Sequence, residues 1–150
     1  MGNHAPFIFR KENIYMARSL IQTVNPSSQT VAVNSIISLG TVARRYGCNL
    51  IMSGNGIEVS GEGYYKVDSA ITLTPTATGN VSVAMLVDGV AVPGAVATGS
   101  VSTVGNIVTL PIVATLRRAC GCCDSVNNVT FVLTSNASTV NNISVRIEKS

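Results

Sequence analysis

Aromatic and charged residues are scarce in this 150-residue chain. It contains no Trp, four Tyr and three Phe, and only 11% of its residues are charged, against about a quarter in an average globular domain. So few rings leave little surface on which bases stack, and the ten Lys and Arg residues are scattered rather than gathered in a basic stripe. We therefore expect no nucleic-acid partner. The single histidine, His4, has no Ser or Cys beside it in a nucleophile motif, so we expect no enzymatic activity.

Long apolar runs are also missing. The N-terminal run of Phe7, Ile8 and Phe9 ends at Arg10 and Lys11, which makes it far shorter than the apolar stretch of a signal peptide or a membrane span. We therefore expect no signal peptide and no membrane partner.

The residues that are present are mostly apolar or small. Hydrophobic residues make up 46% of the chain and the mean hydropathy is +0.38. Because charged residues are few, the polar part of the surface must consist largely of Ser, Thr, Asn and Gly. Such a surface suits packing against other subunits, because a free monomer generally carries more charge for solubility. The composition favours a permanent oligomer or a place inside a larger assembly, with a neutral β domain as the alternative. The length fits a single domain.

Residues 63–97 predict two long strands and the turns that follow them. Apolar and polar side chains alternate there, as in half-buried strands. The first strand places Tyr65, Val67, Ile71 and Leu73 on one face and Lys66, Asp68, Thr72 and Thr74 on the other. The second strand alternates Val81, Val83, Met85 and Val87 with Ser82, Ala84, Leu86 and Asp88. We expect the second strand to lie antiparallel to the first, and Asp88-Gly89 to form a hairpin turn after it.

The rest of the chain continues this strand pattern from Ser19 onward. Turn signals recur about every ten residues, and no amphipathic helix of useful length interrupts them. The other expected strands are 20–24, 31–37, 49–53, 57–60, 96–104, 107–116, 129–134 and 143–147. The sequence therefore predicts an all-β protein, with residues 19–150 forming a single antiparallel β-sandwich or jelly roll of about ten strands.

Residues 1–18 differ in character from the rest. They contain no alternating pattern long enough to join a sheet, so we expect an extended N-terminal arm. The arm carries an apolar run next to two basic residues, which suits binding to a partner protein. The expected partner-binding residues are Phe7, Ile8, Phe9, Arg10 and Lys11. The alternative is that this run folds back onto its own domain or onto a neighbouring protomer.

The cysteines leave three interpretations open. Cys120, Cys122 and Cys123 lie within four positions, and Cys48 lies far upstream. The C-x-x-C spacing is used by structural zinc sites, but a second pair of ligands would have to come from Cys48 and His4. The redox use of this motif needs a helix N-terminus, which an all-β chain does not provide. The thiols are free, or they form disulfides within or between subunits, or they bind a metal; we expect no cofactor.

Two motifs carry a resemblance to a known family. The run G-Y-Y-K-V at residues 63–67 and the run M-L-V-D-G-V-A-V-P-G-A at residues 85–95 resemble the trimeric jelly roll of the tumour-necrosis-factor and complement globular-head superfamily. The resemblance covers about Ile36 to the C-terminus. It is closest to bacterial and bacteriophage members found on spore-surface filaments and on virion fibres or capsids.

The resemblance implies a homotrimer with a structural role. We expect a virion protein of a bacteriophage, which decorates the capsid or forms a head fibre and binds the major capsid protein or another virion protein through its arm. One alternative is a spore-surface, exosporium-like protein in which the cysteine cluster forms cross-links. The other is a receptor- or glycan-binding module, although the shortage of aromatic rings disfavours stacking on sugars.

Overall fold

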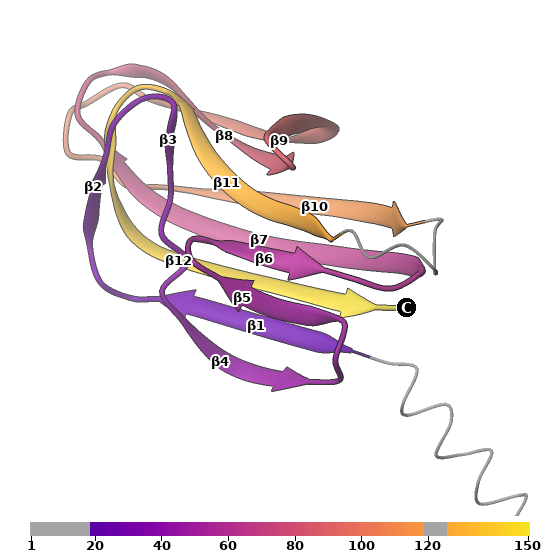
Figure 1. Ribbon diagram of the computed structural model, residues 1–150. Helices are drawn as coiled ribbons and strands as arrows, with labels where there is room; N and C mark the ends of the chain where they lie inside the picture. The colour runs from indigo at the N-terminus through magenta and orange to yellow at the C-terminus, as the bar shows by residue number, and fades with distance from the viewer. Residues whose placement is uncertain (1–18, 119–125) are drawn as a thin grey trace, which may run out of the picture.

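Two antiparallel sheets pack face to face in the computed structural model, which describes residues 19–118 and 126–150 (Figure 1). Sheet A has the order β10 (Val108–Arg118), β7 (Gly63–Pro75), β12 (Ser138–Lys149), β1 (Leu20–Asn25) and β4 (Thr41–Tyr46), with β2 (Gln29–Val31) beside β12. Sheet B has the order β5 (Leu50–Ser53), β6 (Gly56–Val59), β11 (Asn127–Ser135), β8 (Gly79–Val87) and β9 (Val90–Val101), with β3 (Ser35–Ile36) beside β11. The expected all-β sandwich is confirmed, with twelve strands in the described residues rather than about ten.

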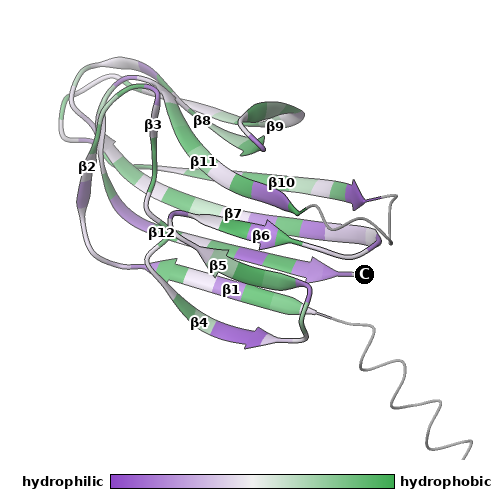
Figure 2. Cartoon of the chain, viewed as in Figure 1, coloured by the Kyte–Doolittle hydropathy of each residue, from purple (hydrophilic) through white to green (hydrophobic). Residues whose placement is uncertain are grey.

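The core lies between the two sheets and follows the alternation of the strands. Along β7 every second residue from Tyr65 to Leu73 is buried, and β12 likewise buries Val140, Ile143, Val145 and Ile147. Figure 2 shows the resulting banding of apolar and polar residues along each strand. The largest fully buried side chains are Tyr65 from sheet A and Phe131 from sheet B. The alternation predicted for residues 63–75 and 143–147 is confirmed.

The expected pairing of the two long strands is wrong. The strand that ends at Pro75 and the strand that begins at Gly79 belong to different sheets, because the turn between them crosses the sandwich. β7 pairs with β10 and β12, whereas β8 pairs with β9 and β11. Their apolar faces meet across the core instead of lying side by side. The alternation of apolar and polar residues indicates which face of a strand is buried, but it does not identify the neighbouring strand.

Two other expectations near the N-terminal end need correction. Residues 31–37 do not form one strand, because Asn34 has a positive φ of 67° and breaks the run into β2 and β3, which join different sheets. β4 was not predicted at all. All six of its residues are exposed at the edge of sheet A, so it has no alternation of buried and exposed positions to reveal it.

The predicted hairpin turn at Asp88-Gly89 is confirmed. The two residues have φ values of 53° and 82°, and they connect the cross-strand pair of Val87 and Val90. The Asp88 carboxylate also accepts hydrogen bonds from the Asn128 backbone N–H at 2.8 Å and from Asn127 Nδ2 at 2.7 Å. The turn therefore fixes the beginning of β11 as well as joining β8 to β9.

Candidate functional site

The described residues contain no cluster of three His, Cys, Asp or Glu side chains that could hold a metal ion. No helix in residues 19–118 and 126–150 is long and apolar enough to cross a membrane. Cys48 is exposed and has no disulfide partner in that part of the chain. The other candidate cysteines, Cys120, Cys122 and Cys123, lie outside the described residues, as do the arm residues Phe7, Ile8, Phe9, Arg10 and Lys11. Those site assignments stay predictions.

The outer face of sheet A, turned away from the core, is the candidate interaction surface. The register of the sheet places side chains from four strands in rows across this face. One row contains Gln22, Arg146, Asp68 and Val113. The next contains Val24, Ser144, Ala70 and Pro111. The short side chains of Ser144 and Ala70 in the second row leave a depression of about 310 Å³ in the face, lined by Gln22, Asp68, Ser69, Ala70, Val113, Ser144 and Arg146.

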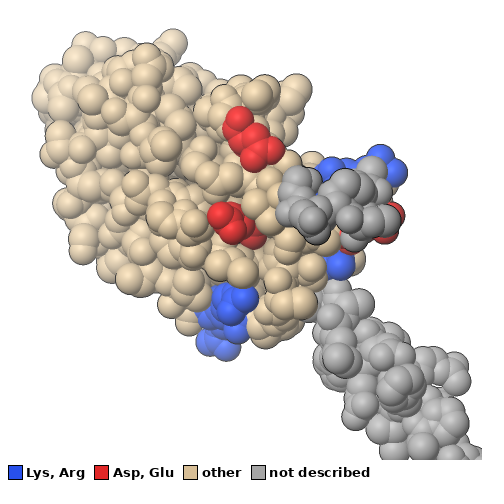
Figure 3. Space-filling model, viewed as in Figure 1, with Lys and Arg blue, Asp and Glu red and all other residues tan. Residues whose placement is uncertain are grey.

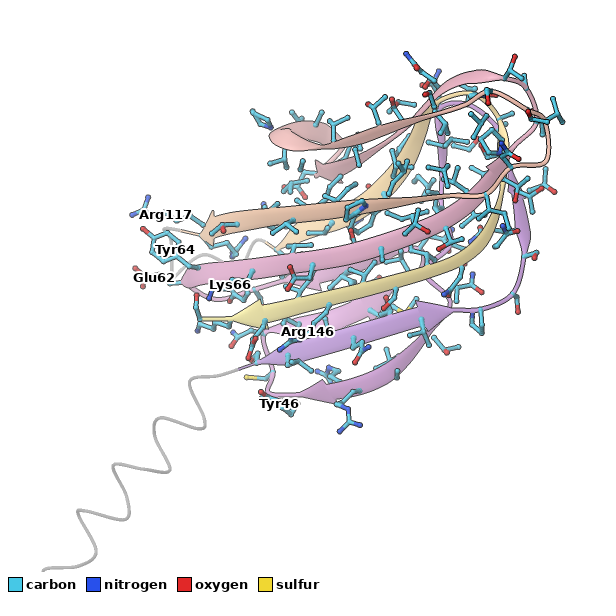
Figure 4. The ribbon with its side chains drawn as sticks, turned by 180° about the vertical axis from the view of Figure 1, so that it is seen from behind. Tyr46, Glu62, Tyr64, Lys66, Arg117 and Arg146 are labelled. Atoms are coloured by element: carbon cyan, nitrogen blue, oxygen red, sulfur yellow. The ribbon has the colours of Figure 1, made fainter. Side chains whose placement is uncertain are left out.

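Four charged side chains lie next to one another on this face, two of them lining the depression, and we name the four the charge block. They are Lys66 and Asp68 on β7 and Arg146 and Glu148 on β12. Lys66 lies directly opposite Glu148, and Asp68 lies directly opposite Arg146. Figure 4 shows the same side of the molecule, with Lys66 and Arg146 labelled. The one ion pair found among the described residues joins Arg146 Nη2 and Glu148 Oε1 at 2.9 Å.

An exposed aromatic ring lies at the end of the same face. Tyr64 is 53% exposed, and the Arg117 guanidinium lies over its ring at 5.9 Å from the centroid. The two residues are cross-strand partners on β7 and β10, and Figure 4 shows them together at the strand ends. A stacked guanidinium is partly preorganised, so this pair offers a flat contact surface next to the charge block.

The outer face of sheet B differs from that of sheet A in its charge. Every Lys and Arg that the structure describes lies on a strand of sheet A, and Glu58 is the one charged residue on the strands of sheet B. Figure 3 shows the side of sheet B: uncharged residues cover most of it, and the charged residues gather toward the half that contains the C-terminus. Ile36, Val132, Ala84 and Val96 form an apolar row across β3, β11, β8 and β9.

Tyr65 anchors the end of the sandwich beneath the charge block. Its ring is fully buried, and its hydroxyl donates to the backbone carbonyl of Ser60 at 2.6 Å, with the carbonyl of Gly61 at 3.2 Å. Arg118 Nε donates to the same Gly61 carbonyl at 3.1 Å. Burial raises the pKa of Tyr65 above its ordinary value of 10.0; the positive charge of Arg118 lowers it and Cys48 adds a smaller increase. The neutral phenol therefore stabilises the strand ends that carry the candidate surface.

Replacing Tyr65 with Phe is expected to remove part of the alkaline sensitivity of the fold. Because the folded pKa of Tyr65 is raised, its stabilisation is fully present below about pH 10 and is lost as the pH rises through the folded pKa. Near neutral pH the variant should lose about 1 kcal/mol with the hydrogen bond, and this difference from wild type should shrink above about pH 10. Denaturant unfolding against pH measures both effects, with the exposed neighbour replaced in Tyr64→Phe as control. A difference that stays constant with pH would contradict the assignment.

Sequence reasoning placed Lys66 and Asp68 on the outward face of their strand but did not find the charge block. Arg146 and Glu148 lie about eighty residues further along the chain, and only the register of β7 with β12 brings the four side chains together. The available signal was the alternation from Tyr65 to Leu73 and from Ile143 to Ile147, which marks each strand as one-sided but does not show that the two strands pair.

No protein-family model matches the sequence, and no curated protein matches it. Solved structures do show a likeness in fold. The chain is similar to the Eiger TNF from S. frugiperda, with a TM-score of 0.64 and 10% identity over 89% of this chain and 91% of that chain. It is similar to the globular domain of zebrafish complement 1qA protein, with a TM-score of 0.61 and 7% identity over 86% of this chain and 94% of that chain.

A third likeness is to a protein of a bacteriophage. The vertex protein P5 of PRD1 aligns with a TM-score of 0.51 and 14% identity over 87% of this chain and 96% of that chain. At such low identities these likenesses concern the fold alone. The chain therefore has the jelly-roll fold found in tumour-necrosis-factor-like and complement globular domains.

Proposed function

We propose that this chain forms a homotrimer with a structural, non-enzymatic role in a bacteriophage virion, where it decorates the capsid or forms a head fibre. The observation that carries the proposal is the outer face of sheet A, with its depression of about 310 Å³ and its balanced charge block. The charge block on this face contains equal numbers of cations and anions, so it is suited to contact with another copy of the same chain. The proposal places this face in the subunit interface.

The composition of the surface supports a permanent assembly. Obligate interfaces bury more than about 2,000 Å² and contain few unpaired charges. The outward rows of sheet A offer Val24, Ala70, Pro111 and Val113 beside the charge block, and Val113 is 70% exposed. Burying this exposed side chain would contribute roughly 1.5–3 kcal/mol per copy. Association would thus cover apolar area that the single chain leaves in water.

The virion role is supported by the fold and by the character of the N-terminal segment. The likeness to the PRD1 vertex protein P5 concerns a jelly roll of nearly the same length. The arm of residues 1–18 is followed by Ser19, whose backbone carbonyl accepts a hydrogen bond from the Lys149 backbone N–H at 2.9 Å, so both ends of the described chain lie together. In our proposal the arm leaves from this end to bind a major capsid or other virion protein, and the opposite, uncharged end projects outward.

Deletion of residues 1–15 tests this role directly. We expect the shortened protein to keep its oligomeric mass and its melting temperature within a few degrees, because the described strands begin at Leu20. It should no longer join the virion, since the apolar run at Phe7 and its basic neighbours would be missing. Incorporation is measured by the amount of tagged protein that sediments with particles produced in its presence.

The matched control replaces only Arg10 and Lys11 with Ser, which keeps the apolar run. This variant should be incorporated more weakly than wild type but better than the deletion. Undiminished incorporation of the deletion variant would contradict the anchoring role, and loss of its folded state would show that the arm packs on its own domain instead.

A further inference from the structure

The charge block on sheet A has a pairing pattern that a single chain leaves incomplete. We propose that the block is a self-recognition site, in which Asp68 of one copy pairs with a cation of the charge block on a neighbouring copy. The inference rests on the proposed homotrimer and adds the residues that select the correct partner surface. Its occupant is a second copy of this chain.

The first observation is the direction of the Arg146 side chain. Arg146 lies directly opposite Asp68 in the register of β7 and β12, yet its guanidinium pairs with Glu148 on its own strand at 2.9 Å. No hydrogen bond or ion pair reaches the side chain of Asp68 or Lys66 within residues 19–118 and 126–150. One anion and one cation of the block are therefore open toward the face of the sheet.

The second observation is the balance of charge. The block contains two cations and two anions, whereas the whole chain has a formal net charge of +3. Burying a charge is costly unless a partner of opposite sign accompanies it. In a closed ring of three copies the contacts are heterologous, so a residue of one copy meets a different residue of the next. A block with both signs can then pair with its own copy without bringing like charges together.

The third observation is the location of the open carboxylate. Asp68 and Arg146 both line the depression of about 310 Å³, and Val113 lines its other side. A neighbouring copy seated in this depression would remove water from Asp68 and strengthen any pairing there. The alternative is that the four charges are ordinary solvated side chains that keep the sheet from non-specific association.

Reversal of single charges separates these two interpretations. Asp68→Lys is expected to weaken association by about 100-fold or more, because it brings like charges together in the interface. Glu58→Lys, which makes the same change on sheet B, should leave association unchanged. Association is measured by light scattering over a dilution series, and circular dichroism checks that both variants are folded.

A reversed block gives the more specific result. The protein with Lys66→Glu, Asp68→Arg, Arg146→Asp and Glu148→Lys keeps both cross-strand pairs, so it should fold and form its own trimers. When it is co-expressed with wild type under a different affinity tag, purification through either tag should recover only the protein that carries that tag, since mixed contacts would oppose like charges. If the four-residue variant does not fold, Asp68→Arg with Arg146→Asp reverses one cross-strand pair and serves the same comparison.

The outcomes distinguish this inference from the proposed function. A monomeric wild-type protein would overturn both. A trimeric wild type with a trimeric Asp68→Lys variant, or with free mixing of wild-type and reversed chains, would overturn self-recognition by the charge block and leave the homotrimer standing.

Discussion

Replacing Phe131 with Ala is expected to lower the free energy of unfolding by about 3–5 kcal/mol. Phe131 is one of the two largest fully buried side chains, and it lies on β11 in the middle of sheet B, opposite Met85 on β8. Its ring fills the space between the sheets, so its removal loses apolar burial and leaves a cavity that strands paired on both sides cannot readily close. Denaturant unfolding at one fixed protein concentration measures the change, since association also contributes to stability.

The next residue along the strand provides the control. Val132 points to the outer face of sheet B and is only half-buried, so Val132→Ala should cost about 1 kcal/mol or less. Equal losses for the two variants would contradict the placement of Phe131 in the core and would call the register of β11 into question.

The second large effect is expected at Gly40, immediately before β4. Its φ is +80°, and a Cβ added there would lie 2.3 Å from the carbonyl oxygen of Val24 and 2.6 Å from Cβ of Asn25. Gly40→Ala therefore combines the roughly 1–2 kcal/mol cost of a left-handed backbone with a clash against β1 that requires a backbone shift, about 1–3 kcal/mol more. The melting temperature should fall steeply, and the edge of the candidate surface should loosen.

Gly54 separates the two contributions. It also has a positive φ, of +59°, but nothing lies within 4 Å of the position that its Cβ would occupy. Gly54→Ala should thus carry only the backbone cost of about 1–2 kcal/mol. If the two alanine variants were equally stable, the close approach of Gly40 to β1 would be wrong.

The parts of the fold that the sequence predicts are those set by local chemistry. The alternation from Tyr65 to Leu73 identifies a one-sided strand because side chains on a strand point to opposite faces in turn. Asp88 and Gly89 identify a turn because they tolerate positive φ. The all-β class and the position of the core follow from many such segments.

The remaining features depend on contacts between distant segments. The neighbours of β7 are β10 and β12, the latter more than sixty residues later in the chain, and not β8, which follows it directly. β4 has only exposed residues, so its position comes from pairing with β1 rather than from its own pattern. The charge block also depends on such a contact, because Asp68 and Arg146 become neighbours only through the register of β7 with β12. Local patterning alone cannot supply it.

The mass of the native protein tests the central claim of a self-associating jelly roll most directly. Light scattering of residues 1–150 at micromolar concentration and moderate salt should give three times the 15.6-kDa chain mass. The mass should not change when reductant is added, because the proposed interface uses sheet A and not the cysteines. A mass equal to one chain would contradict the account, and so would a trimer that dissociates on reduction.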